Sequence, residues 1–374
     1  MQIILSLFIV CAVFAFLIET SENINTRKAL FLISLLYLTF VSGTRLIGGM
    51  DFLTYYNHYA AAPTFPDALN PDMRNNNYEI GYTYIVAFFK TIGFSFFGFC
   101  LIHSAFFFTC VYFGIKRYTK HFGIVIFVLL YKLLFYNTMI SMRQSITVAC
   151  FLLMVPWIEQ KKFIKYYIAA ILVSTVHNGA YLLFLIYPLA YIKLSKNLIS
   201  LLNFVFIPTI LIGFTGIDIL GPIGQFLQDN AANENMERKA IKYFENENIS
   251  PIGIFHTLEY FLLMYFFFIN LNKIKLNNPK VHTVVWLFLC LLPLFTLFRG
   301  SEILTREKDY FLIYYSVIIG YLIDKLPKYR TLIFAFVTLV CAFGYYRYVL
   351  LFDDGEFLKY RSWLFNPEYS IFLN

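Results

Sequence analysis

The chain has 374 residues, of which 59% are hydrophobic, 20% are aromatic and only 14% are charged. Soluble proteins carry about 25% charged residues, so this composition excludes a soluble globular domain. The net charge of +8 does not indicate nucleic-acid binding, because the basic residues form short clusters between apolar segments. The composition therefore predicts an all-α polytopic membrane protein.

Apolar segments of roughly 15 to 20 residues fill most of the chain, and each can cross most of a ~30 Å hydrocarbon core at about 1.5 Å per residue. We predict about 12 transmembrane helices in this sequence. The first resembles a signal-peptide core, but it lacks a basic start and a small-residue cleavage site, so we count it as a span. The predicted spans are 2–18, 29–47, 96–115, 122–137, 143–158, 163–177, 178–192, 198–216, 253–271, 281–298, 309–323 and 331–350.

The segment 80–95 is apolar but short, and Lys90 and Gly93 interrupt it, so we predict an interfacial or re-entrant helix there. If it does not cross, the loops on one side hold sixteen Lys/Arg, with Lys165 included, and four acids. The other side holds thirteen Lys/Arg and seventeen acids. The positive-inside rule then places the N- and C-termini outside. The basic loops are 19–28, 116–121, 159–162, 193–197, 272–280 and 324–330.

Residues 1–374 contain no Gly/Ser-rich or Pro-rich linker and no evident repeat, so we predict a single transmembrane domain. Two outer loops, 48–79 and 217–251, are large enough to shape a site. The second loop contains NENMERKAIKYFEN, which predicts a short amphipathic helix near 233–246 on the membrane surface.

Charged residues gather at the outer ends of the predicted spans, where they can meet in one place. A charge near the bilayer centre costs about 2.5–3.5 kcal/mol and less near the interface, so such residues either snorkel or serve a polar site. The residues concerned are Arg45, Asp51, Arg143, His177, Arg299 and Arg306.

His177 lies between Lys162 and Lys193, an interval that must cross the membrane and return in about 15 residues per leg, or ~22 Å. The tip of this hairpin is therefore below the outer surface, where a histidine can act as a buried general base or bind substrate. The alternative is a histidine that packs against a neighbouring helix. The other histidines, His58 among them, are predicted to be loop, interface or core residues.

Arg143 and Gln144 lie where an outer loop enters a span, so the guanidinium can present a planar fork of donors to a phosphate or diphosphate. A snorkelling interface arginine is the alternative. In the turn GSEILTREKD we favour Arg306, because Tyr310 is four residues later on the same helical face.

The pattern Arg45-x3-Gly49-x-Asp51-x3-Tyr55 places an acid just outside the second span. Asp51 is a second candidate for a general base, and a solvated loop aspartate is the alternative.

Sequence motifs exclude several other enzyme classes. The chain has no Walker A motif, no H-E-x-x-H, no outer D-x-D and no G-x-S-x-G. The six cysteines lie in apolar segments without ligand spacing, so we expect buried thiols, with no metal site, disulfide framework or cofactor.

Five short segments, taken together and in order, resemble the EpsG-like branch of the Wzy-type O-antigen and exopolysaccharide polymerases. The segment STVHNGAYL departs slightly, because Asn178 follows His177 where a small residue such as Ser is expected. The segments are RLIGGMDFLTYY (45–56), YEIGYTYI (78–85), SMRQSITVA (141–149), STVHNGAYL (174–182) and LTREKDYF (304–311).

The resemblance implies a metal-independent glycosyltransferase on the outer face of a bacterial inner (cytoplasmic) membrane. Such an enzyme polymerises undecaprenyl-diphosphate-linked oligosaccharide repeat units into O-antigen, capsule or exopolysaccharide. His177 and Asp51 are then the candidate bases. The expected substrate-binding residues are Arg45, Arg143, Gln144, Arg306, Tyr310, Tyr55 and Glu79.

The expected partners are the lipid-linked glycans, the lipid bilayer and, in the same pathway, a chain-length regulator and a flippase, with no nucleic acid. Two alternatives stay open. A flippase or transporter would carry ionisable residues near the bilayer midplane and repeated halves. An O-antigen ligase or a sugar O-acyltransferase would differ in its acceptor or donor.

Overall fold

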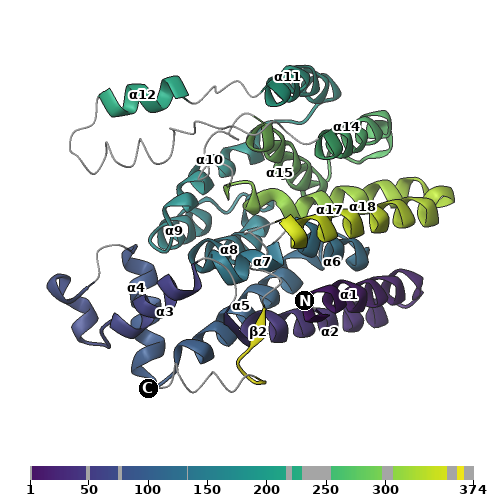
Figure 1. Cartoon of the computed structure of the whole chain (residues 1–374). Coiled ribbons are helices and arrows are strands. Elements are labelled where there is room, and N and C mark those ends of the chain that lie inside the picture. Colours follow the sequence, from purple (N-terminus) through teal and green to yellow (C-terminus); the bar gives the residue numbers. More distant parts are fainter. Residues whose placement is uncertain are drawn as a thin grey trace. The chain divides into compact units, whose positions relative to one another are not determined.

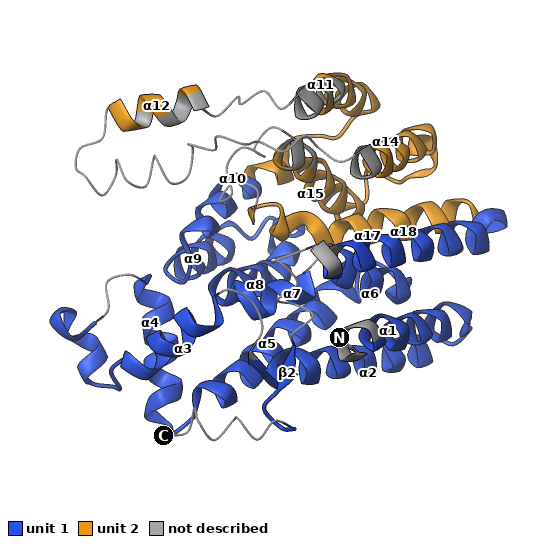
Figure 2. Cartoon of the chain, in the orientation of Figure 1, with its two compact units in different colours: residues 1–187, 327–374 blue, residues 188–326 orange. Residues whose placement is uncertain are grey.

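The computed structural model describes the chain as helices joined by short connections, with one small two-stranded sheet among its described parts (Figure 1). It forms two compact units, residues 1–187 with 327–374 and residues 188–326 (Figure 2). This division does not test the prediction of a single transmembrane domain, which stays a prediction. The described residues are 2–47, 51–74, 78–132, 134–215, 221–229, 254–296, 306–351 and 360–365.

The first unit is built on long apolar helices that pack against one another in pairs, with α2 on α5, α5 on α8, α1 on α6 and α8 on α9. Their bounds are α1 Gln2–Thr20, α2 Ile24–Gly43, α5 Phe96–Ile115, α6 Phe122–Tyr131, α7 Leu134–Ile140, α8 Met142–Glu159, α9 Phe163–Ser174 and α18 Arg330–Leu351. Small polar side chains hold the helices close, because the Ser42 hydroxyl lies 3.0 Å from that of Ser104 and 2.5 Å from that of Thr138.

Within the described residues, three helical segments are long and apolar enough to cross a membrane, Ile24–Gly43, Phe96–Ile115 and Pro327–Arg347. The helices α6 and α7 form a fourth if they are taken as one span with a bend of 47°. The all-α membrane fold is therefore confirmed, and the count of about 12 spans stays a prediction.

The segment after His177 was predicted as one span, 178–192, but it is divided into three short helical pieces, η3 Asn178–Leu182, α10 Leu183–Ile186 and η4 Tyr187–Tyr191. Pro188 cannot donate a backbone hydrogen bond, and Gly179 is a weak helix former. This segment therefore lacks the continuous helix seen in α5.

The first outer loop contains more structure than its polar composition indicates. It forms α3 Phe52–Ala61, η1 Asp67–Leu69 and η2 Pro71–Met73, and α4 Ile80–Thr91 follows. The helix α4 corresponds to the predicted interfacial helix near 80–95. Strand β1 (Arg45–Ile47) pairs antiparallel with β2 (Arg361–Ser362), so the end of the chain returns to the end of α2.

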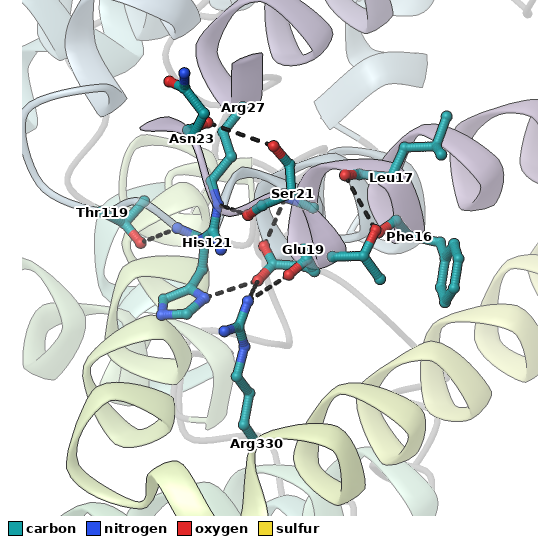
Figure 3. Close-up of polar contacts among 11 residues, drawn as sticks. Phe16, Leu17, Glu19, Ser21, Asn23, Arg27, Thr119, His121 and Arg330 are labelled. Atoms are coloured by element: carbon teal, nitrogen blue, oxygen red, sulfur yellow. Dashed lines mark hydrogen bonds and ion pairs between the residues drawn. The ribbon is translucent and has the colours of Figure 1, made fainter. Parts of the chain in front are cut away.

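A buried polar cluster ties the end of α1 to the starts of α6 and α18 (Figure 3). The Glu19 carboxylate accepts hydrogen bonds from His121 Nδ1 at 2.8 Å and from the Gly123 amide at 3.2 Å. Arg330 donates to the Glu19 backbone carbonyl. Gly123 is needed here because a Cβ would lie 2.7 Å from the Ala15 carbonyl oxygen.

The second unit contains α11 Lys196–Thr215, α12 Gly221–Asp229, α14 Ile254–Ile269, η5 Leu271–Lys273, α15 Pro279–Thr296 and α17 Asp309–Lys325. In it, α15 packs against both α11 and α17. The sequence did not predict α12, and the predicted loop helix near 233–246 lies outside the described residues.

Candidate functional site

Four segments of the first unit bring their polar side chains to one place. Tyr55 comes from α3, Glu79 immediately precedes α4, Arg143 lies in the first turn of α8, and His177 lies between α9 and η3. In Figure 1, the labels α3, α4, α8 and α9 mark these neighbouring segments. The helix starts matter because their free backbone N–H groups favour negative charge nearby.

Glu79 is the centre of the polar contacts. One carboxylate oxygen accepts a hydrogen bond from Arg143, and the other lies 3.3 Å from His177 Nδ1 and 3.2 Å from the Asn178 backbone nitrogen. The ion pair is largely buried, since 13% of the Glu79 side chain and 25% of the Arg143 side chain are exposed. Glu79 therefore joins three segments through one carboxylate.

The pKa of Glu79 reflects these partners. Burial by itself raises the pKa, but the hydrogen bond from His177 and the charge of Arg143 outweigh burial. The pKa is about 2, below its ordinary value of 4.5. Glu79 is therefore ionised at neutral pH, and its carboxylate accepts hydrogen bonds without donating any.

The contact between α4 and the end of α9 brings Glu79 to His177. The Gly81 amide donates to the Thr175 carbonyl at 2.8 Å. A Cβ at Gly81 would lie 2.2 Å from the Thr175 hydroxyl and 2.8 Å from its carbonyl oxygen. Only glycine allows this approach, which explains the glycine of YEIGYTYI.

Arg143 packs on aromatic rings as well as pairing with Glu79. Its guanidinium carbon lies 4.8 Å from the centre of the Tyr78 ring, a cation–π contact, and Arg143 also hydrogen bonds with Tyr55. Its Nε is buried and has no hydrogen-bond partner among the described residues. The guanidinium is therefore held in place, with one nitrogen still able to donate.

Arg45 is a fully buried cation at the start of β1, with 1% of its surface exposed. It donates to the Ser42 carbonyl at 2.9 Å, while its Nε has no partner within the described part of the chain. Next to it, Leu46 belongs to the same apolar cluster as Tyr55 and Met142, the neighbour of Arg143. Arg45 thus adjoins this cluster through Leu46, and none of the contacts in the described residues joins it to Glu79, Arg143 or His177.

Asp51 and Gln144 are two further predicted site residues in the first unit. Asp51 lies at the N-terminal cap of α3 without a side-chain capping bond, and its charge acts on both Tyr55 and Tyr78. Gln144 is buried, with 3% of its surface exposed. Asp51 is therefore close to the tyrosines of the site, and none of the contacts among the described residues joins it to His177.

A family model for the EpsG family matches residues 28–362 of the chain. The chain belongs to the EpsG family. A search of the curated proteins found no match, and a search of the solved structures found none. The resemblance drawn from the five segments is thus confirmed, and the EpsG family is associated with polysaccharide biosynthesis. Membership and the apolar helices together indicate a membrane protein of polysaccharide biosynthesis.

Two predicted site residues of this EpsG-family protein, Arg306 and Tyr310, belong to the second unit. Arg306 is exposed, whereas Tyr310 is fully buried. Burial and the neighbouring charge of Asp309 raise the pKa of Glu307 to about 8. Arg299 lies outside the described residues.

The described residues contain no group of three or more His, Cys, Asp or Glu side chains arranged to hold a metal ion. Sequence reasoning set aside one residue that the structure brings to the site, His58. No local signal could have identified it, because its surroundings come from α4 and α8.

Proposed function

We propose that this EpsG-family protein is a membrane glycosyltransferase that polymerises undecaprenyl-diphosphate-linked oligosaccharide repeat units. The reaction takes place on the outer face of a bacterial inner membrane, where the glycan is built into O-antigen, capsule or exopolysaccharide. The observation that carries the proposal is the contact of Glu79 with both His177 and Arg143. It supports the proposal because an imidazole that could accept a proton shares a carboxylate with a cation.

His177 is the general base. An ionised carboxylate accepts a hydrogen bond, so Nδ1 of His177 donates to Glu79, and Nε2 is the atom that takes the proton in the proposed reaction. The same division of roles holds a histidine base in a hydrolase triad, where a carboxylate orients the ring and stabilises its protonated form. We therefore assign Glu79 a positioning role, and its role in substrate binding stays a prediction.

The proposed reaction is a glycosyl transfer, in which one bond to the anomeric carbon forms and another breaks. Nε2 takes the proton of the acceptor hydroxyl, whose oxygen attacks the anomeric carbon of the growing glycan. The bond from that carbon to the diphosphate oxygen breaks, and undecaprenyl diphosphate leaves with the bonding electron pair. His177 then returns the proton to solvent or to the diphosphate.

The leaving diphosphate needs positive charge and donors. Arg143 shares the Glu79 carboxylate with His177, and Arg45 is a second buried cation of the first unit. Charge-assisted bonds to a departing anion act most strongly in such a water-poor site. Gln144 and Tyr55 of the first unit complete the proposed binding set, and Arg306 and Tyr310, which belong to the second unit, stay predicted substrate-binding residues.

A deletion strain tests the function. Cells that lack the gene should accumulate single repeat units on undecaprenyl diphosphate in the outer leaflet and make no polymer ladder. Units that remain in the inner leaflet would indicate a flippase. Polymer that stays on its lipid carrier, without transfer to its final acceptor, would indicate a ligase.

A further inference from the structure

His58 lies on α3, one helical turn after Tyr55, and only 3% of it is exposed. Both ring nitrogens are buried and have no hydrogen-bond partner among the described residues. A neutral imidazole has one donor and one acceptor, and buried polar groups in native proteins are nearly always paired. His58 is therefore an unsatisfied polar group that needs an explanation.

His58 is continuous with the site through one aromatic ring. Its ring centre lies 3.8 Å from that of Tyr78 and 5.7 Å from that of Tyr82. The guanidinium carbon of Arg143 lies 4.8 Å from the centre of the same Tyr78 ring, and Glu79 follows Tyr78 in the chain. A continuous series of contacts thus leads from His58 through Tyr78, Arg143 and Glu79 to His177.

The charges around His58 keep it neutral. Burial lowers its pKa to about 4, and the positive charges of Arg143 and Lys90 act in the same direction. At neutral pH the ring therefore donates one hydrogen bond and accepts another, and it is a weak proton acceptor. These properties suit recognition of a hydroxyl-rich ligand rather than base catalysis.

Aromatic faces combined with a few polar groups are the usual lining of a small-molecule site. The apolar C–H face of a sugar ring packs on tyrosine, and its hydroxyl groups pair with a histidine that donates on one side and accepts on the other. Tyr78, which is partly exposed, can supply the first kind of contact and the unpaired nitrogens of His58 the second.

We propose that His58 binds the saccharide of the lipid-linked substrate, with its two ring nitrogens paired to sugar hydroxyl groups beside the rings of Tyr78 and Tyr82. The inference rests on the proposed function and adds a sugar subsite to it. His58 positions the sugar next to His177, which exchanges the proton.

The test uses purified full-length protein and lipid-linked repeat units extracted from the deletion strain. His58→Phe keeps the ring and removes both nitrogens, and it should raise KM for the repeat unit by about 10- to 100-fold with a smaller change in kcat. His58→Asn retains a polar atom near Nδ1 and His58→Gln retains one near Nε2, so each should give an intermediate KM. Bare undecaprenyl diphosphate should bind wild type and His58→Phe equally.

Tyr59→Phe is the matched control, because it removes a buried 2.6 Å hydrogen bond from the next residue of α3 to the Phe94 carbonyl. It should leave KM unchanged. A wild-type KM in His58→Phe would overturn the inference and show a packing role. If His58→Phe does not fold, the amide variants decide, and a wild-type KM in both overturns it. Wild-type protein that makes no polymer from these units would overturn the proposed function and the inference together.

Discussion

Replacing Glu79 by glutamine removes one negative charge and keeps the size of the side chain. The folded protein holds the pKa of Glu79 at about 2, and its ordinary value is 4.5. At about 1.4 kcal/mol per pKa unit, the ionised carboxylate contributes about 3 kcal/mol to the folded state at neutral pH. Glu79→Gln should lose most of this contribution to the stability of the folded state and leave Arg143 without its acid partner.

The pH dependence follows from the direction of the shift. A lowered pKa in the folded state gives stability that is fully present above pH 4.5 and is lost as the pH falls toward about 2. The difference in unfolding temperature between wild type and Glu79→Gln should therefore be large at pH 7 and shrink below pH 4.5. Glu22→Gln, at an exposed glutamate between α1 and α2, is the control and should unfold like wild type at every pH.

Glu79→Gln should lower the polymerisation activity of the protein as well as its stability. If the same 3 kcal/mol or so orients His177 in the transition state, Glu79→Gln should reduce polymerisation by about 10²-fold, since each 1.4 kcal/mol or so is a factor of ten. Thermal unfolding in detergent and single-turnover transfer measure the two effects. Wild-type unfolding temperature and wild-type turnover in Glu79→Gln would refute the reasoning.

Three further predictions separate the roles of the neighbouring residues. Gly81→Ala should disrupt the close contact with Thr175, lower the unfolding temperature and reduce activity, whereas a wild-type result would show that α4 can shift without harm. Arg143→Ala should abolish polymer at a normal protein level, and Arg143→Lys should restore only part of it, because lysine offers a point charge in place of a planar fork. Polymer gels measure the product and immunoblots measure the protein level. Full polymer from Arg143→Ala would show that Arg143 is only an interface arginine. His177→Gln should lose about 10² to 10⁴ in single-turnover rate while substrate binding survives, and a near-wild-type rate together with a large loss in Asp51→Asn would move the base to Asp51.

The long helices could be predicted because their signal is local. The apolar run at 96–115 becomes α5 over the same residues, bounded by the Ser95 capping hydroxyl and by Lys116. The helix in 80–95 could also be predicted, since α4 ends at Thr91, near the Lys90 and Gly93 that interrupt its apolar run, whereas its interfacial position stays a prediction. In both cases the local sequence indicates where the helix stops.

The site was predicted residue by residue but not as a network. Arg143 and Glu79 are 64 positions apart, and His177 and Glu79 are 98 apart, so no spacing rule joins them. Their meeting depends on α4 packing against Thr175, which Gly81 permits. The sequence predicted Glu79 as a substrate-binding residue, which stays a prediction, but it could not predict the contacts of Glu79 with Arg143, His177 and the Asn178 amide.

His58 could not be selected from the sequence for a related reason. A histidine in a polar loop has the same local appearance whether it is solvated or buried. The burial of His58 arises only when α3 folds and Tyr78 and Tyr82 pack against it. Tertiary packing therefore converts an ordinary loop histidine into an unsatisfied group of the site.

The most direct test of the central claim is polymerisation by the purified protein alone. Protein in lipid nanodiscs, supplied with lipid-linked repeat units, should produce a ladder of glycans and release one undecaprenyl diphosphate for each new linkage. His177→Gln protein prepared in the same way should give single repeat units and almost no release. A wild-type preparation that binds the units but forms no ladder, or a ladder of equal length from His177→Gln, would contradict the account.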